Sequence, residues 1–282
     1  MITSTFDTAT DIERRFEHID TVIFKDPFSA SKEIAKEIAE LIREKQAQNQ
    51  PCVLGLATGN SPIELYSELV RLHKHEGLSF KNVISFNLDE YYPISPDSEN
   101  SFNQFMQLYL FNHVDLLPEN CHIPDGCLSK DAIDDYCKDY ESKIEALGGI
   151  DLQILGIGAN GHIGFNESGS TEDSKTRWVA LDDITIKEAS PYFSGIEHTP
   201  KAAITLGVQK IMEAKRVILM AWGHKKAKII SSAIEGKVTQ KVPASYLQNH
   251  SNVTFVLDHA SSAKLTRVHS PERLHNLTSG AK

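Results

Sequence analysis

Asp151-Leu-Gln-Ile-Leu-Gly-Ile-Gly-Ala-Asn-Gly-His-Ile-Gly-Phe-Asn-Glu167 is the stretch around which the rest of the chain is interpreted. Its apolar run from Leu152 to Ile157 is typical of a buried strand. A glycine-rich turn that carries Asn160, His162 and Glu167 follows directly. In an open α/β sheet, ligands bind beyond the carboxyl ends of the parallel strands. The stretch therefore predicts a core strand that ends in an active-site loop.

Three glycines of this stretch match the spacing of a dinucleotide-binding fingerprint. Gly156, Gly158 and Gly161 satisfy G-x-G-x-x-G, which also requires a helix that begins at the last glycine and holds the pyrophosphate. Residues 162–170 contain two glycines, one asparagine and two serines, a loop composition rather than a helical period. We therefore expect no dinucleotide at this loop.

Strand and helix patterns alternate on both sides of the central stretch. The expected strands are Thr21 to Phe24, Cys52 to Ala57, Val83 to Phe86, Ala202 to Leu206, Arg216 to Trp222 and Val253 to Leu257. The first expected helix is capped by Ser29 or Ser31 and carries Ile34, Ile38, Leu41 and Ile42 on one face. The other expected helices cover Pro62 to His75, Phe102 to Phe111, Asp131 to Leu147 and Lys225 to Ile234. This alternation predicts an α/β fold with a mostly parallel, doubly wound, Rossmann-like sheet and helices on both faces.

No linker, repeat or low-complexity tract divides the chain, so we expect one catalytic domain over residues 21–268. Residues 1–20 form an expected N-terminal appendage, and residues 269–282 an expected C-terminal tail. The segment from Ser168 to Thr199 breaks the strand–helix alternation and directly follows the central stretch. An insertion at this place predicts a lid, although a static surface excursion stays open.

Composition narrows the class of ligand. A formal net charge of -9 and a pI near 5.7 argue against a nucleic-acid or anionic-membrane surface, because both require clustered positive charge. The four cysteines show no C-x-x-C pair, so we expect reduced thiols and no structural metal. No signal peptide and no run of about 20 apolar residues is apparent. A small-molecule substrate and a cytoplasmic location are expected.

The turn from Ala57 to Pro62 lies between an expected strand and an expected helix. Ser61 suits the helix N-cap and Glu64 the third helical position, which predicts a capping box. Free N–H groups of Thr58, Gly59, Asn60 and Ser61 and the two hydroxyls at this helix end would hold a phosphate. The Gly-Lys-Ser/Thr ending of a P-loop is absent. An ordinary strand-to-helix turn uses the same residues and stays an alternative.

Three further polar groups follow expected strands. Asp89 and Glu90 come after Val83 to Phe86, where a carboxylate could act as a base on bound substrate, and a solvated acidic loop is the alternative. His162 can exchange protons near neutral pH, and the nearby Glu167 carboxylate would orient it, with a buried structural histidine as the alternative. Lys226 could reach a phosphate as a point charge, or it could be a solvated surface lysine.

Taken together, these stretches resemble the glucosamine-6-phosphate deaminase (isomerase) family. The matching pieces are residues 55–62 (GLATGNSP), 86–91 (FNLDEY), 156–167 (GIGANGHIGFNE) and 203–208 (AITLGV). They occur in the family order and at family-like intervals. The resemblance covers about residues 21–264, and the central motif is its most specific part.

The resemblance implies a reaction without cofactor or metal. The sugar ring opens, a proton moves from C2 to C1, and the resulting enolamine loses ammonia to give fructose 6-phosphate. Asp89 matches the base that takes the C2 proton, and His162 matches the ring-opening acid/base. Asn160 and Glu167 match the residues that support this histidine. Thr58, Gly59, Asn60, Ser61 and Lys226 match phosphate contacts.

The chain departs from the family pattern at three places. Asn160 stands where some members carry aspartate, and an amide cannot supply the anionic support of a carboxylate. Pro191 stands where many members carry a phosphate-clamping arginine, which leaves Lys187 or a different mode of substrate binding to compensate. Arg177 matches an arginine of the allosteric site of regulated members, but Val179 stands in place of the partnering lysine.

Two other functions stay open on the sequence. A sugar-phosphate lactone hydrolase resembling 6-phosphogluconolactonases would use a similar fold and also hold a phosphate. A non-catalytic sugar-phosphate sensor would need a DNA-binding domain, for which residues 1–20 are too short. The preferred epimer of the amino sugar and the formation of a homo-oligomer are also left open.

Overall fold

The computed structural model describes residues 2–271, so most of the expected C-terminal tail, 269–282, lies outside the described residues. Seven strands form one sheet with the order β1-β10-β9-β6-β2-β3-β5, and every neighbouring pair is parallel. Their bounds are β1 Asp20–Phe24, β2 Cys52–Leu56, β3 Val83–Asn87, β5 Cys121–His122, β6 Leu152–Leu155, β9 Val217–Ala221 and β10 Val253–Asp258. The predicted doubly wound parallel sheet is confirmed.

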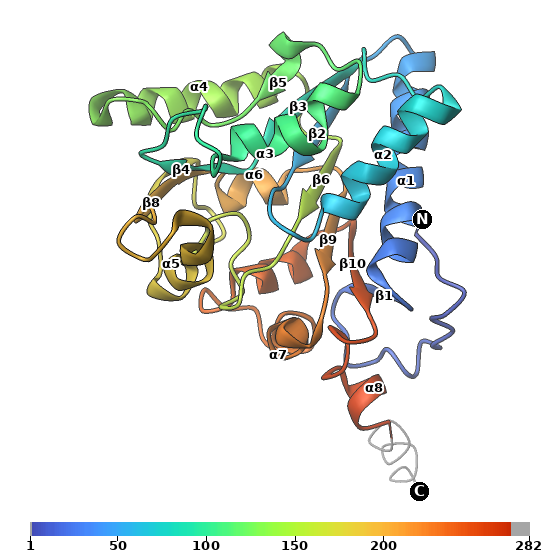
Figure 1. Ribbon diagram of the computed structural model, residues 1–282. Helices are drawn as coiled ribbons and strands as arrows, with labels where there is room; N and C mark the ends of the chain where they lie inside the picture. Colours follow the sequence, from blue (N-terminus) through green and yellow to red (C-terminus); the bar gives the residue numbers. More distant parts are fainter. Residues whose placement is uncertain (1, 272–282) are drawn as a thin grey trace, which may run out of the picture.

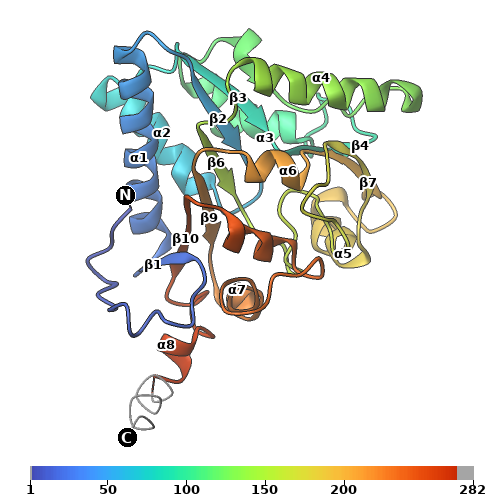
Figure 2. The same cartoon turned by 180° about the vertical axis from the view of Figure 1, so that it is seen from behind.

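Helices lie on both sides of this sheet (Figures 1 and 2). The α-helices are α1 Pro27–Ala47, α2 Ile63–Glu76, α3 Phe102–Tyr109, α4 Ile133–Ala146, α5 Asp183–Ala189, α6 Val208–Met212, α7 Ala227–Ile234 and α8 Thr266–His269. Short 3-10 helices cover η1 Phe111–His113, η2 Pro118–Asn120, η3 Lys130–Ala132, η4 Ser190–Phe193, η5 His224–Lys226 and η6 Pro243–Asn249. None of the helices in residues 2–271 combines the length and the apolarity that a bilayer span requires.

Strand β6 belongs to the centre of the core. All four of its residues are buried, as are all residues of β2 and β9 on either side. The sequence of a strand that is covered on both faces is a continuous run of apolar residues, without alternating apolar and polar positions. The predicted buried strand at the start of the central stretch is therefore confirmed.

A second, antiparallel sheet of three strands was not predicted. It has the order β4-β8-β7, with β4 Asp89–Tyr92, β8 Ala202–Thr205 and β7 Arg177–Ala180. Asp89 and Glu90 therefore lie on a strand and not in a solvated acidic loop, because β4 pairs with β8, more than 100 residues away in sequence. Figure 1 shows this sheet beside α5, at one end of the parallel sheet.

Two predicted helix starts are wrong. Helix α1 begins at Pro27, and Asp26 caps it by accepting a hydrogen bond of 2.7 Å from the Ser29 N–H. Helix α2 begins at Ile63, its N-cap is Pro62, and no side chain caps it. The expected capping box with Ser61 therefore does not form, and the Ser61 hydroxyl is not used to cap the helix.

The first twenty residues contact the C-terminal part of the described chain. Arg267 lies between two buried carboxylates, with its Nη1 atom 2.6 Å from Asp7 Oδ1 and its Nε atom 2.7 Å from Glu17 Oε1. The Asp7 carboxylate also accepts a hydrogen bond of 2.9 Å from the Ile23 N–H of β1. These contacts hold the segment against the parallel sheet. The domain boundaries given above remain a prediction.

Candidate active site

The site lies where the direction of the chain along the parallel sheet reverses. From β2 the chain continues to β3 and β5 on one side, whereas from β6 it continues to β9 and β10 on the other. The loops after β2 and β6 therefore separate at a topological switch point, where open α/β sheets bind their ligands. A cavity of about 1010 Å³ opens at this point.

Most of the sequence-predicted site residues line this cavity. They are Thr58, Gly59, Asn60, Ser61, Asp89, His162 and Lys226. Asn160 and Glu167 do not line the cavity but support His162 from behind. No group of three or more His, Cys, Asp or Glu side chains in residues 2–271 is placed to hold a metal ion.

The turn after β2 presents unpaired donors to the cavity. Gly59 has φ +88°, a left-handed conformation that favours glycine. No backbone N–H from Thr58 to Ser61 donates to a carbonyl or side chain in the described part of the chain. The Ser61 carbonyl accepts a hydrogen bond of 3.0 Å from the Trp222 indole, which ties the turn to the end of β9. The turn therefore has the geometry of an anion-binding concavity.

Asp89 is 6% exposed, and its carboxylate faces the cavity. No residue among those described donates a hydrogen bond to this carboxylate, which leaves both oxygens open to a ligand. Burial, together with the negative charge of Glu90, raises its pKa to about 8. A carboxylate with a pKa near the working pH is a much better general base than free aspartate.

Glu90 has a structural environment that differs from that of its neighbour. Its carboxylate accepts hydrogen bonds from the N–H groups of Tyr91 (2.9 Å), Phe102 (3.0 Å) and Asn103 (3.0 Å). Burial raises its pKa to about 7, although these three donors favour the ionised form. Glu90 thereby joins β4 to the first turn of α3 and places a negative charge beside Asp89.

Glu167 is the centre of a hydrogen-bond network behind the histidine. Its Oε2 atom lies 3.1 Å from His162 Nδ1 and accepts a hydrogen bond of 2.7 Å from Asn160 Nδ2. Its Oε1 atom accepts a hydrogen bond of 2.6 Å from the Thr185 hydroxyl. Burial alone would raise the pKa of Glu167, but the hydrogen bonds and the His162 ring lower it to about 2. The carboxylate stays ionised and orients the imidazole.

Asn160 acts on the histidine differently from the expectation. Its Nδ2 group donates to Glu167, and its Oδ1 atom accepts a hydrogen bond of 3.2 Å from the His162 backbone N–H. The amide thus holds the loop and the carboxylate, and no hydrogen bond joins it to the imidazole ring. It supports the ring only through Glu167.

Gly158 explains why the central stretch needs glycine at this position. A Cβ atom at residue 158 would lie 2.2–2.4 Å from atoms of the His162 ring, which no side chain can tolerate. The imidazole therefore lies directly on the Gly158 backbone. Of the three glycines of the apparent fingerprint, Gly158 makes room for His162, and no helix begins at Gly161.

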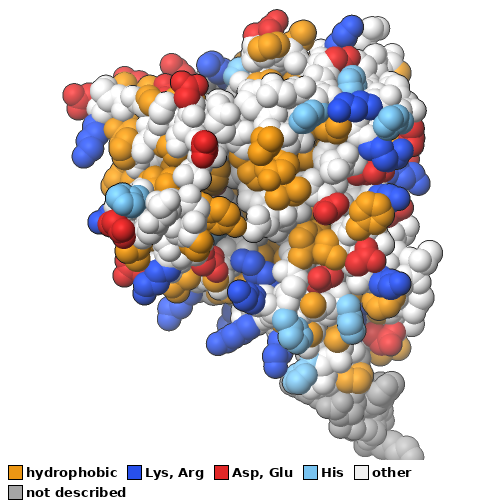
Figure 3. Space-filling model, in the orientation of Figure 1, with side chains coloured by type: hydrophobic (Ala, Val, Ile, Leu, Met, Phe, Trp, Pro, Cys, Tyr) orange, Lys and Arg blue, Asp and Glu red, His pale blue; other side chains and the backbone are white. Residues whose placement is uncertain are grey.

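Basic and acidic side chains meet in the wall of the cavity. Lys225 and Lys226 come from η5 at the end of β9, and Glu188 comes from α5. Burial lowers the pKa of Lys226, and the Glu188 carboxylate opposes this effect. Figure 3, which shows the molecule in the orientation of Figure 1, has several lysine and arginine side chains on the lower part of the visible face. The cavity lining itself carries charges of both signs, namely Lys187, Lys225 and Lys226 and the carboxylates Asp89, Glu99 and Glu188.

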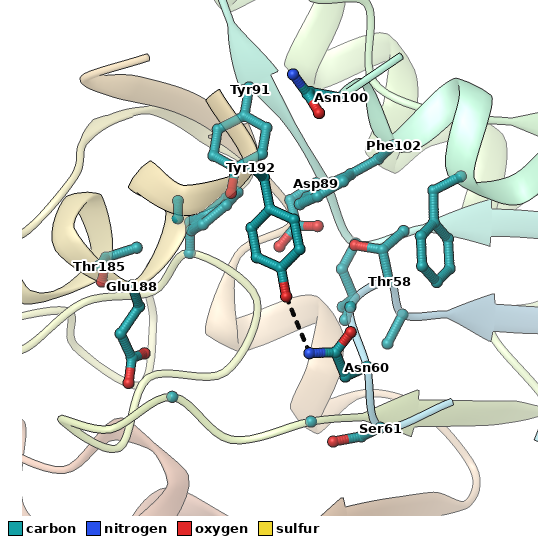
Figure 4. A pocket seen from close by; sticks show the side chains of 18 of the residues that line it. Thr58, Asn60, Ser61, Asp89, Tyr91, Asn100, Phe102, Thr185, Glu188 and Tyr192 are labelled. Atoms are coloured by element: carbon teal, nitrogen blue, oxygen red, sulfur yellow. Dashed lines mark hydrogen bonds between the residues drawn. The ribbon is translucent and has the colours of Figure 1, made fainter. Parts of the chain in front are cut away.

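The segment expected to form a lid contributes residues that the sequence did not reveal. Thr185 of α5 contacts Glu167, and Tyr192 of η4 accepts a hydrogen bond of 3.0 Å from Asn60 Nδ2 (Figure 4). Pro191 and Lys187 also line the cavity. Neither a threonine nor a tyrosine in a polar segment carries a local signal, because both contacts depend on residues far away in sequence.

Arg177 does not line the cavity. Its Nη1 atom donates to Asn166 Oδ1 (2.9 Å) and to the Lys175 carbonyl (3.0 Å), and its Nη2 atom donates to Ser170 Oγ (2.9 Å). The guanidinium is thereby used to hold the loop from residue 166 to residue 175. An allosteric role for Arg177 stays a prediction.

The parallel sheet, the reversal point and a cavity that joins a carboxylate, a histidine and an anion-binding turn define an α/β enzyme with a small-molecule site. A family model for glucosamine-6-phosphate isomerases/6-phosphogluconolactonases matches residues 25–256. The chain belongs to this family.

Relatives and solved structures agree with this assignment. A glucosamine-6-phosphate deaminase-like protein of Bacteroides thetaiotaomicron is 48% identical over 257 residues, which is 91% of this chain but only 39% of that relative. A glucosamine-6-phosphate deaminase of Thermoanaerobacter sp. (strain X514) is 44% identical over 227 residues, or 80% of this chain and 89% of the relative.

Among solved structures, a monomeric glucosamine-6-phosphate deaminase superimposes with a TM-score of 0.83 at 38% identity, over 87% of this chain and all of the other. The 6-phosphogluconolactonase of Trypanosoma cruzi shares the fold, with a TM-score of 0.68 at 24% identity over 88% of this chain and 97% of the other.

Proposed function

We propose that this protein is a glucosamine-6-phosphate deaminase, which converts glucosamine 6-phosphate and water into fructose 6-phosphate and ammonia. The observation that carries the proposal is the open Asp89 carboxylate. It is buried, accepts no hydrogen bond from the described residues, and has a pKa raised to about 8 by burial and by Glu90. These are the properties of a base that removes a proton from carbon.

In the proposed mechanism, His162 moves a proton between the sugar O1 and O5 atoms and so opens the ring. Asp89 takes the proton from C2 while O1 gains a proton, which gives the enolamine. Asp89 then returns its proton to C1 while the nitrogen loses one, which gives a C2 imine. Water adds to this imine, and ammonia leaves. Glu167 keeps the imidazole oriented throughout, and Asn160 keeps Glu167 in place.

The proposed phosphate contacts are the N–H groups of the turn from Thr58 to Ser61, the hydroxyls of these two residues, and Lys226. Anchoring the phosphate at one end of the cavity would position C1 and C2 between Asp89 and His162, and such positioning can supply much of the rate acceleration. No residue role in this scheme calls for a cofactor. We propose a cytoplasmic enzyme acting on a small amino sugar phosphate.

Ammonia release from a panel of amino sugar phosphates tests the proposal. We expect turnover of glucosamine 6-phosphate by the purified chain and none by Asp89→Asn, which keeps the shape of the side chain but removes the base. Hydrolysis of 6-phosphogluconolactone without ammonia release from any amino sugar phosphate would instead assign the lactone hydrolase function.

A further inference from the structure

A side chain of the α5–η4 segment is joined to the phosphate turn across the cavity. The Tyr192 hydroxyl oxygen accepts a hydrogen bond of 3.0 Å from Asn60 Nδ2. The two residues are 132 positions apart in sequence. Figure 4 shows the tyrosine ring extending from η4 toward the turn that carries Thr58, Asn60 and Ser61. The phenol thus closes the phosphate end of the cavity from the opposite wall.

The packing of the next residue explains why Tyr192 points there. Phe193 lies edge-on against Tyr91, with ring centroids 5.1 Å apart, and belongs to the apolar cluster that joins η4 to the small sheet. Successive side chains of a 3-10 helix diverge by about 120°. With Phe193 held in the cluster, Tyr192 is directed away from it and into the cavity.

The turn that carries these two residues is itself closed by hydrogen bonds. Ser194 follows η4 with φ +59°, and the Gly195 N–H donates a hydrogen bond of 3.1 Å to the Ser190 carbonyl. Tyr192 is 59% exposed, so neither burial nor neighbouring side chains alone fix its position. The aromatic anchor and the bond from Asn60 therefore place the hydroxyl.

A phenol group is both a donor and an acceptor. The Tyr192 oxygen is used as an acceptor by Asn60, and no described residue accepts its hydroxyl proton. The unpaired N–H groups of Thr58 to Ser61 belong to the turn whose Asn60 side chain contacts this oxygen, and the lining of the cavity contains lysines but no arginine among the described residues. A free O–H donor beside a nest of free N–H donors is suited to a multiply charged oxyanion.

We propose that Tyr192 donates its hydroxyl proton to an oxygen of the substrate phosphate and is a specificity-determining residue for phosphorylated ligands. The inference rests on the proposed function only for the identity of the sugar. A neutral donor on η4 adds a directional contact without adding charge next to Glu188. Asn60, which holds the phenol oxygen, orients this donor toward the turn.

Isothermal titration with inorganic phosphate, compared with the kinetics of ammonia release, tests the inference in Tyr192→Phe. We expect phosphate affinity about tenfold weaker and KM for glucosamine 6-phosphate about tenfold higher, with kcat within about twofold, because a hydrogen bond to a charged group is lost. Tyr136→Phe is the matched control. Its hydroxyl accepts from the Asp125 N–H (3.1 Å) and lies outside the cavity lining, so phosphate affinity should not change.

Unchanged phosphate affinity in Tyr192→Phe would overturn the inference. If Tyr192→Phe weakened the binding of glucosamine and of glucosamine 6-phosphate equally, the inference would also be overturned. That result would mean that the hydrogen bond to Asn60 only holds the α5–η4 segment in place. Weaker phosphate binding in a protein that releases no ammonia from any amino sugar phosphate would uphold the inference and reject the proposed deaminase function. The absence of phosphate and sugar-phosphate binding by the unmodified protein would reject both.

Discussion

The Nδ1 atom of His162 lies 3.1 Å from Oε2 of Glu167, and this contact determines which ring nitrogen is available for chemistry. The pKa of Glu167 is lowered to about 2, so its carboxylate is ionised and accepts a hydrogen bond from Nδ1–H of the imidazole. The Nε2 atom, to which no described residue is hydrogen-bonded, is then free to exchange a proton with a ligand. The histidine thus depends on Glu167 for its tautomer.

The first prediction concerns the charge of Glu167. Asn160, His162 and Thr185 all donate hydrogen bonds to the two carboxylate oxygens of Glu167. In Glu167→Gln, an N–H₂ group replaces one of these oxygens, so at least one of the three donors faces another donor. We expect kcat for ammonia release to fall about 100-fold, and the protein to lose about 1–3 kcal/mol of unfolding free energy.

Steady-state kinetics and chemical denaturation measure these two effects. Glu172→Gln is a matched control, because Glu172 is exposed and its carboxylate accepts hydrogen bonds from the Asn249 amide, away from His162. A kcat that stays within twofold of the unmodified protein in Glu167→Gln would contradict the orienting role.

The second prediction concerns Asn160. Asn160→Asp would place a carboxylate where the Nδ2 group now lies 2.7 Å from Glu167 Oε2. The two carboxylates would share a proton, because like charges at this distance cannot both stay ionised. We expect the pKa of Glu167 to rise from about 2, and an NMR pH titration of its carboxyl carbon measures this change. A Glu167 pKa that stays near 2 in Asn160→Asp would contradict the coupling between the two side chains.

The third prediction concerns the pH dependence caused by Asp89. Its pKa is 3.8 in an unfolded chain and about 8 in the folded protein. Between these values the folded state binds the additional proton, so this contribution to stability is complete below pH 3.8 and is lost as the pH rises through 8. Turnover depends on the ionised Asp89 carboxylate, so it should increase as the pH rises toward 8.

Asp89→Asn should therefore remove activity and reduce the loss of thermal stability at high pH. We expect its melting temperature to exceed that of the unmodified protein by several degrees at pH 9 and by much less at pH 5. Differential scanning calorimetry at both pH values measures this, with the exposed Asp97→Asn as control. If the melting temperatures of Asp89→Asn and of the unmodified protein changed with pH to the same extent, this would contradict a raised pKa of Asp89.

The fourth prediction uses the contact between Gly158 and His162. In Gly158→Ala, the new methyl group would collide with the imidazole, which lies 2.2–2.4 Å away. We expect the ring to be displaced and kcat to fall by at least about 100-fold, because misplacing a catalytic group by about 1 Å has effects of this size.

Gly156→Ala separates this effect from substrate contact. A Cβ atom at residue 156 meets no protein atom within 4 Å, although the residue lines the cavity. We expect a change in KM there rather than in kcat. Similar kcat losses in both variants would mean that the collision with His162 is not the cause.

The sequence by itself determined the parallel sheet and the common location of most candidate site residues. Apolar runs such as Leu152 to Ile157 and the helical periods between them are local patterns, and covered parallel strands need little else to be recognised. The turn from Thr58 to Ser61, His162 and Lys226 each follow a strand, and strand ends meet at one edge. Their common location therefore followed from chain order.

Only the tertiary structure decided how these residues are used. Asp89 and Glu90 lie on β4 because that strand pairs with β8, and the small sheet has no local signature. The contacts of Glu167 with Thr185 and of Asn60 with Tyr192 join residues 18 and 132 positions apart. Such hydrogen bonds form where folded segments meet in space, and no periodicity along the chain encodes that meeting.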